Sequence, residues 1–124
     1  MPIIKSSSAP TFAVPGLQVI GLAAPSRGAQ ETSVWRLSVA PGSDGTPHTV
    51  DREEIFVALA GRAVAEVAGE TFELAAGDAL VVPPHVAFSL GNPHAEPFEA
   101  IAALPVGGRA VLPGGEAFVP PWAA

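Results

Sequence analysis

The stretch that decides the fold runs from Gly42 to Asn92 and reads GSDGTPHTVDREEIFVALAGRAVAEVAGETFELAAGDALVVPPHVAFSLGN. Its first half contains a spaced pattern in which Gly42 is followed, after five intervening residues, by His48. Glu54 and Gly61 complete this pattern, and a largely apolar run lies between them. A short apolar run that is closed by a turn residue is typical of a buried β-strand.

The second half of the stretch contains another spaced pattern. Gly77 is followed, after five intervening residues, by Pro83, and Phe88 and Asn92 come further along the chain. Between the two patterns, residues 68–70 read Ala-Gly-Glu. This triplet predicts a hairpin turn in which glycine supplies a positive φ.

Strand patterns dominate the rest of the chain as well. No window shows helical periodicity, because Gly or Pro interrupts nearly every candidate. Turn signals recur at short spacing, which favours an all-β sandwich or barrel. The predicted strands are 17–22, 33–39, 54–60, 62–67, 71–74, 79–82, 86–90 and 97–104.

Length and composition limit the classes of function. A chain of 124 residues is long enough for one domain with a core, and its net charge is −6 with Lys5 as the only lysine. An acidic surface repels phosphates, so we expect no nucleic-acid partner and no anionic-membrane partner. The chain has no cysteine, which excludes disulfides and thiolate metal sites.

The start of the chain has no apolar signal segment, and the longest apolar runs are too short to cross a bilayer. We therefore expect a soluble cytoplasmic protein. A single domain is predicted, with a core barrel at about 15–105, an N-terminal arm at 1–14 and a C-terminal tail at 106–124. Because exposed Phe118 and Trp122 would lower solubility, the tail is expected to pack on the barrel or on a partner.

The two patterns together resemble the cupin superfamily, whose members are small β-barrels that usually hold a metal on three histidines and one glutamate. Carried over residue by residue, His48 matches the first histidine and Glu54 matches the glutamate. Val50 and Phe88 stand where the other two histidines would be, and His85 stands in place of a glycine. The resemblance implies a jelly-roll-like β-barrel of two antiparallel sheets, with two of its four metal positions apolar.

Strand alternation predicts the lining of the barrel. Side chains alternate between the two faces of a strand, so His48 and Val50 share the face that the resemblance places in the lumen. Glu54 and Phe56 are then expected to point inward from the next strand. Val86, Phe88 and Leu90 share parity, and they are expected to line the lumen with these residues.

The same alternation places Ile55, Val57 and Leu59 on the outer face of their strand. A strand that is apolar on both faces is normally covered on both. Since cupins are commonly dimers, the resemblance and the pattern agree on a homodimer formed through this outer face.

Three hypotheses for the lumen remain open. A metal-dependent oxygenase or isomerase would need a third ligand beside His48 and Glu54, and His85 is the candidate, although its offset from Phe88 points it to the opposite face. Without a metal, the imidazole and the carboxylate could act in acid–base catalysis, but a hydrogen-bonded structural pair is favoured.

The remaining hypothesis, which we favour, is a pocket without a complete metal site that binds a small apolar or aromatic metabolite. Its expected ligand-binding residues are His48, Val50, Glu54, Phe56, Val86 and Phe88. A bulky Phe88 could instead fill the lumen and leave a purely structural dimeric barrel. The cofactor prediction is none, with a divalent metal as the alternative.

Overall fold

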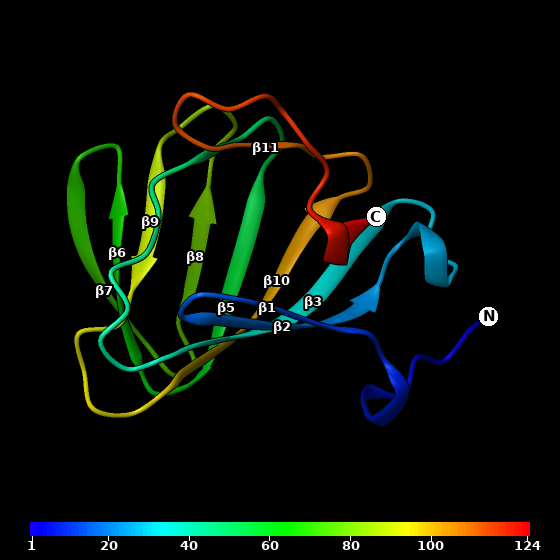
Figure 1. Ribbon diagram of the computed structural model, residues 1–124, viewed down its shortest axis with the longest axis horizontal. Coiled ribbons are helices and arrows are strands. Elements are labelled where there is room, and N and C mark those ends of the chain that lie inside the picture. The colour runs from blue at the N-terminus through cyan, green and yellow to red at the C-terminus, as the bar shows by residue number, and fades with distance from the viewer.

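The computed structural model describes all residues, 1–124, and its regular elements are strands and short 3-10 helices (Figure 1). The strands are β1 (Thr11–Val14), β2 (Leu17–Ala23), β3 (Thr32–Val39), β4 (Thr49–Val50), β5 (Glu54–Ala60), β6 (Arg62–Val67), β7 (Glu70–Ala75), β8 (Ala79–Val82), β9 (Phe88–Gly91), β10 (Phe98–Pro105) and β11 (Ala110–Val111). The 3-10 helices are η1 (Ser6–Ser8), η2 (Pro25–Arg27) and η3 (Pro121–Ala123). The all-β prediction is confirmed.

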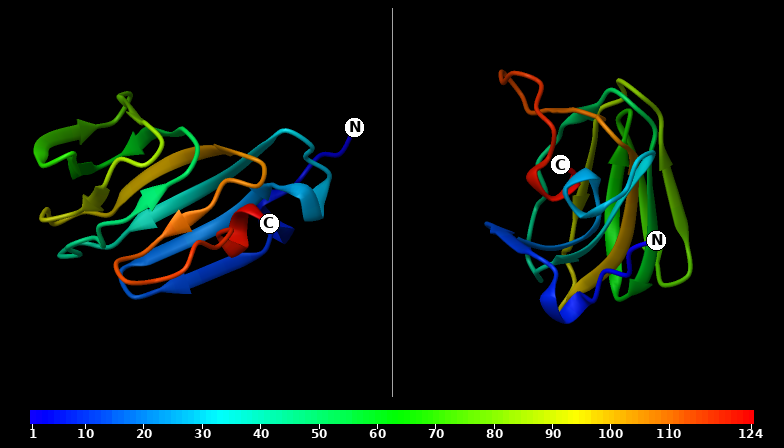
Figure 2. Two further views of the ribbon diagram at one scale, coloured as in Figure 1. Left: turned by 90° about the horizontal axis from the view of Figure 1, so that it is seen from above. Right: turned by 90° about the vertical axis from the view of Figure 1, so that its right-hand side faces the viewer.

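The strands form two layers, which Figure 2 shows from above and from the side. One layer is a six-stranded antiparallel sheet in the order β1-β2-β3-β10-β5-β8. The other contains a three-stranded sheet, β7-β6-β9, and a two-stranded sheet, β11-β4. Isolated bridges from Ser43 to Asn92 and from His48 to Phe88 join the segment before β4 to β9. The second layer is therefore continuous from β7 to β11.

The two central strands of the large sheet, β3 and β10, bury one face against the second layer. Burial alternates residue by residue along β3 and β10, which pair in register with Trp35 opposite Ala102. Their inward side chains meet those of the second layer in a core cluster of 17 buried residues. Burial of this apolar area is the main stabilising contribution to the fold.

The predicted strands agree with the structure most closely in the middle of the chain. β5, β6 and β8 begin and end where the sequence predicted them. The hairpin between β6 and β7 is also confirmed, and both of its turn residues have positive φ, 51° at Ala68 and 82° at Gly69. β1, β4 and β11 were not predicted, and two of these three strands contain only two residues each.

The faces of β5 are assigned correctly by alternation. Glu54 and Phe56 are buried on the inner face, with exposed fractions of 4% and 5%. On the outer face, Val57 and Leu59 remain 39% and 42% exposed, and Ile55 is half-buried.

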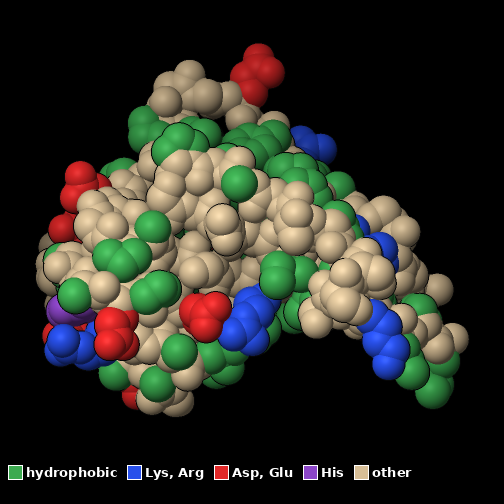
Figure 3. All heavy atoms as spheres, turned by 60° about the horizontal axis from the view of Figure 1, so that its bottom comes forward, with side chains coloured by type: hydrophobic (Ala, Val, Ile, Leu, Met, Phe, Trp, Pro, Cys, Tyr) green, Lys and Arg blue, Asp and Glu red, His purple; other side chains and the backbone are tan.

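The two ends of the chain differ in how they pack. Trp122 of η3 lies 6.1 Å from the ring of Phe12 and 6.4 Å from that of Trp35, measured between ring centroids. The Ser33 hydroxyl fixes this end by donating a hydrogen bond of 2.8 Å to the Ala123 carbonyl. The first residues instead stand away from the barrel, with Ile3 82% exposed, and a notch separates this arm from the body (Figure 3). Every helix is too short to span a membrane.

Candidate functional site

The first candidate residue, His48, lies where the loop before β4 meets β9. The main-chain N–H of His48 donates to the main-chain carbonyl of Phe88 at 3.0 Å, and the main-chain N–H of Phe88 donates to the main-chain carbonyl of His48 at 2.9 Å. This bridge places the two rings against each other, with 4.4 Å between centroids. His48 Nδ1 lies 2.8 Å from the Thr46 carbonyl oxygen, so Nδ1 carries a proton and donates it. In the neutral ring, Nε2 is then free to accept a hydrogen bond.

Glu54 is the second candidate and is a buried acid on the inner face of β5. It begins β5 opposite Val82 of β8, and its side chain enters the core. No hydrogen bond or ion pair joins its carboxyl group to the rest of the protein. Burial raises the pKa of Glu54 from 4.5 to about 8, because an apolar surrounding disfavours the charged form. At neutral pH the group is therefore mainly a neutral carboxylic acid with an O–H to donate.

Apolar and aromatic side chains fill the interior beside His48. Phe88 is 2% exposed, and its ring lies 5.8 Å from that of Phe56 between centroids. Val50 is also 2% exposed, and all three residues belong to the core cluster. The positions where the resemblance would place two further histidines are thus occupied by closely packed apolar side chains.

Val86 and Leu90, which were both expected to line the lumen, differ in their contact with the core. Leu90 packs against the core cluster from β9. Val86 is half-buried, but it precedes β9, which begins at Phe88 and not at residue 86 as predicted. The cause is the loop before β9, where His85 has a φ of 64° and donates its N–H to the Val50 carbonyl at 2.7 Å. Strand parity therefore does not apply at Val86.

The residues present do not fit the metal site that was considered with His48, Glu54 and His85. The structure contains no group of three or more His, Cys, Asp or Glu side chains that could hold a metal ion. His85 is exposed on the loop between β8 and β9, whereas Glu54 is buried on β5. Its position before the start of β9 explains why it does not replace the missing histidine at Phe88.

The predicted hydrogen-bonded pair of His48 and Glu54 is wrong. The protonated nitrogen of His48 is committed to the Thr46 carbonyl, and the ring packs on Phe88. Sequence alone gave no signal for Thr46, because a main-chain carbonyl can accept from any nearby donor whatever its side chain. Glu54 consequently has no hydrogen-bond partner within the protein, and its carboxyl oxygens keep slight contact with open space.

An open groove lies on the other side of the second layer. It has a volume of ≈ 280 Å³ and runs between the loop 42–47 and strands β6 and β9. Only one of its 11 lining residues, Val64, is hydrophobic. This groove has no signature in the sequence, because its residues come from three segments that only the sheet pairing brings together.

Comparison with known proteins supports the architecture. A family model described as a cupin domain matches residues 35–104, which is more than half of the chain. No curated protein matches the sequence.

Several solved structures share the fold. The polyketide cyclase RemF from Streptomyces resistomycificus is 17% identical with a TM-score of 0.75, and the match covers 85% of this chain and 79% of that one. KdgF from Halomonas sp. is 24% identical with a TM-score of 0.72, over 84% and 94% of the two chains. A salicylate 1,2-dioxygenase from Pseudoaminobacter salicylatoxidans, with gentisate, is 21% identical with a TM-score of 0.72, over 85% and 31%. At these identities the likeness shows the fold alone.

Proposed function

Since the chain belongs to the cupin family, we propose that it binds a small apolar or aromatic molecule inside the barrel, without a complete metal site. The observation that supports this proposal is Glu54, a residue only 4% exposed whose carboxyl oxygens form no hydrogen bond within the protein and keep slight contact with open space. Buried polar groups in folded proteins nearly always have a partner, so an unpartnered one is a candidate for ligand contact.

The chemistry of Glu54 narrows the class of ligand. A neutral carboxyl group donates one hydrogen bond, and in an apolar surrounding such a bond is stronger than in water. A ligand with an acceptor such as a carbonyl oxygen would supply the hydrogen bond that the protein itself does not give this O–H. The rings of Phe56 and Phe88 suit a flat apolar or aromatic body, with Val50 completing the wall.

Entry of the ligand requires a rearrangement at His48 and Phe88, because these rings pack together at 4.4 Å between centroids. The side chain of His48 is held by a single hydrogen bond to Thr46 and is half-buried. Its rotation would expose Nε2 as a second polar contact for the ligand. The gentisate-bound dioxygenase is an example of this fold in a protein that holds an aromatic acid.

Native mass spectrometry of the untagged protein tests the proposal, because it reports bound ligand, bound metal and subunit count together. Ligand-observed NMR with a panel of small aromatic carbonyl compounds gives the complementary measurement. Wild-type protein and Glu53→Gln, which changes an exposed neighbouring acid, are expected to bind the same compound. Glu54→Met, which removes the donor at similar size, and Phe88→Ala are expected to bind it at least tenfold more weakly, the size of a loss of about 1.4 kcal/mol.

Equal binding by all four proteins would refute the site assignment. A stoichiometric metal that is lost in His48→Ala would refute the absence of a metal site.

A second candidate role is a structural barrel with a filled interior. The observation in its favour is the close packing of Phe88, which is 2% exposed within the core cluster. This role predicts that no compound of the panel binds and that Phe88→Ala opens a cavity without giving a function.

We also propose a homodimer formed through the outer face of the large sheet. Val57 of β5 lies between Ile101 of β10 and Ala79 of β8, and Ile55 pairs with Val81, which is 52% exposed. These residues form one apolar patch on an otherwise uncovered sheet face, which is the kind of surface that subunit association buries.

Sedimentation analysis tests the dimer. Val57→Glu should shift the protein to a monomer, because it places a charge within the patch. Phe72→Glu is the matched control, since Phe72 is 47% exposed on β7 of the other sheet and should leave the dimer intact. A monomeric wild type, or equal effects of both changes, would refute this interface.

A further inference from the structure

The groove on the outer side of the second layer has a defined structural origin. β9 pairs along its whole length with β6, but on its other side it meets the loop before β4 only at two bridges. Between these bridges the loop has four residues, 44–47, while β9 has three, 89–91. The extra residue bends the loop away from the sheet plane, as in a β-bulge.

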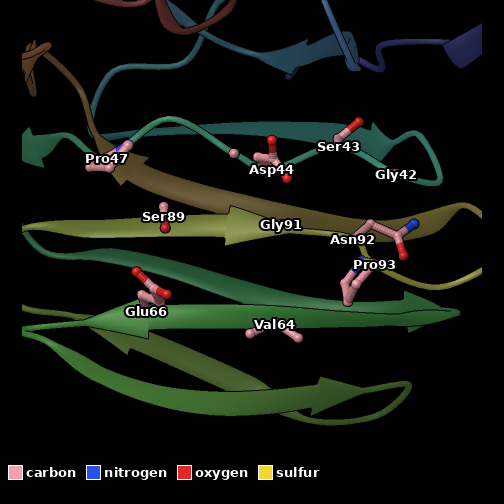
Figure 4. Close-up of a pocket in the computed structure, with 11 residues that line it drawn as sticks. Gly42, Ser43, Asp44, Pro47, Val64, Glu66, Ser89, Gly91, Asn92 and Pro93 are labelled. Carbon is pink, nitrogen blue, oxygen red and sulfur yellow. The ribbon is translucent and has the colours of Figure 1, made fainter.

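Two glycines allow the bent loop to approach β9. A side chain at Gly91 would lie 2.9 Å from the Asp44 carbonyl oxygen, and one at Gly45 would collide with the Leu90 carbonyl. Gly45 also has a φ of 75°, which other residues rarely adopt. The floor of the groove is therefore main chain, and its polar side chains stand around it (Figure 4).

The charge of the groove is wholly negative. Asp44 on the loop and Glu66 on β6 line it, and no Lys, Arg or His side chain does so. Neither carboxylate takes part in a side-chain hydrogen bond or an ion pair, in contrast to Glu73 and Glu99, which pair with arginines. The groove can therefore neutralise a cation without first releasing a partner within the protein.

Ser89 provides an independent indication of a ligand. It is 6% exposed and lies on β9 directly opposite Glu66, between that residue and the loop of Asp44 (Figure 4). Its hydroxyl group lines the groove and has no hydrogen-bond partner in the protein. The hydroxyl oxygen still reaches the groove, so a donor bound there can supply the hydrogen bond that the protein does not.

The set of donors argues against a single metal ion. Only two acids, Asp44 and Glu66, line the groove, and the structure contains no group of three or more His, Cys, Asp or Glu side chains that could hold one. The two acids lie on segments separated by β9, which places their backbones roughly 10 Å apart at two strand spacings. A second, smaller hollow of ≈ 90 Å³ shares Pro47, Glu66 and Ser89 and extends the groove along β9 to Ala87. The ligand space is therefore elongated.

We propose that this groove binds a linear aliphatic diamine or polyamine, with one ammonium group at Asp44 and another at Glu66 and Ser89. The ammonium groups supply the donors that the two carboxylates and the hydroxyl group can accept. The aliphatic spacer crosses the main-chain floor at Gly91, where no side chain intervenes. Binding at this site is independent of the barrel interior and of any ligand of Glu54.

Isothermal titration calorimetry of the protein with 1,4-diaminobutane and spermidine, at low and at physiological salt, tests the proposal. Wild-type protein should bind one molecule per chain, more weakly at the higher salt concentration because the contacts are partly exposed. Glu66→Gln and Asp44→Asn should each weaken binding roughly tenfold, as expected for the loss of a charge-assisted hydrogen bond. Ser89→Ala should weaken it about fivefold.

Glu116→Gln is the matched control, because it removes the same charge from an exposed position in the tail. It should bind like the wild type, and the main-chain amide signals of Ser89 and Gly91 should shift in NMR spectra on addition of the diamine. Equal weakening in Glu116→Gln would show attraction to net charge only and would overturn the proposal. Absence of saturable binding, or equally tight binding of the monoamine butylamine, would also overturn it.

Discussion

Phe88 and Ser89 are neighbours in β9, yet they face opposite regions of the molecule with opposite chemistry. Phe88 points into the barrel, where it packs with Phe56 and Val50 in the core cluster, and the uncharged Glu54 is also buried on the inner face of β5. Ser89 points to the outer groove, where Asp44 and Glu66 stand around a main-chain floor. One strand thus separates a carboxyl group that burial keeps protonated from two carboxylates that remain in contact with water. The contrast shows that solvent access, more than residue type, decides whether a carboxyl group of this protein can donate a hydrogen bond or attract a cation.

The largest expected effect concerns the pH dependence of stability. Burial raises the pKa of Glu54 from 4.5 to about 8, so between these values the folded state holds a proton that the unfolded state has released. The free energy of unfolding should therefore fall as pH rises through this window, by up to roughly 5 kcal/mol, and level off above it. Urea unfolding at pH 5 and pH 8.5 measures the change.

Glu54→Gln should remove most of this slope, whereas Glu66→Gln in the groove should preserve it. Identical slopes in the wild type and in Glu54→Gln would contradict the buried-acid description.

The next largest effect compares the two neighbours on β9 directly. Phe88→Ala should lower the free energy of unfolding by about 4 kcal/mol, because it leaves a cavity between Phe56 and His48. Ser89→Ala should change it by less than about 1 kcal/mol, since its hydroxyl has no partner to lose. Denaturant unfolding of both variants gives the two numbers. A similar loss of unfolding free energy in both variants would mean that the two faces of β9 do not differ in their contribution to stability.

A third prediction concerns the end of β9, where the interior and the groove meet. Asn92 is fully buried, donates to the Val39 and Glu96 carbonyls at 3.1 and 2.7 Å, and accepts from the His94 N–H at 3.0 Å. Asn92→Ala should destabilise the fold by about 2–3 kcal/mol, because it leaves buried main-chain groups unpaired. Thermal unfolding checks this value, and a change below about 1 kcal/mol would show that the loop 92–96 does not depend on Asn92.

The smallest effect lies in the hairpin that carries Glu66. Ala68 adopts a φ of 51°, a left-handed conformation that asparagine accepts more readily than alanine. Ala68→Asn should therefore raise the free energy of unfolding by about 0.5–1 kcal/mol. Ala76→Asn, in a turn without positive φ at that residue, should give no gain. Equal gains at both positions would assign the effect to something other than backbone strain.

The same comparison explains how far the sequence could predict this structure. Alternation along β5 correctly placed Glu54 and Phe56 inside and Val57 outside, because a continuous strand keeps its parity. Parity was not applicable at Val86, since the positive φ of His85 ends regular geometry before β9 starts. Short strands such as β4 were missed because their pairing is set by distant partners and not by local pattern.

The candidate site was predictable in part for related reasons. The spaced pattern that begins at Gly42 identified His48 and Glu54 as candidate site residues, and the alternation along β5 predicted that the Glu54 side chain points inward. Their mutual hydrogen bond was predicted wrongly, because the competing Thr46 carbonyl belongs to the main chain. The groove was not predicted at all, since residues 42–47, 64–66 and 89–93 are brought together only by sheet pairing.

The central claim is that β9 separates one protonated, buried carboxyl group from the water-exposed acids of the groove. A pH titration followed by carbon-13 NMR of the side-chain carboxyl groups measures this directly. We predict one carboxyl signal that titrates near pH 8, is absent in Glu54→Gln and is unchanged in Glu66→Gln. Titration of every Asp and Glu signal near the ordinary values of about 4 would contradict the account.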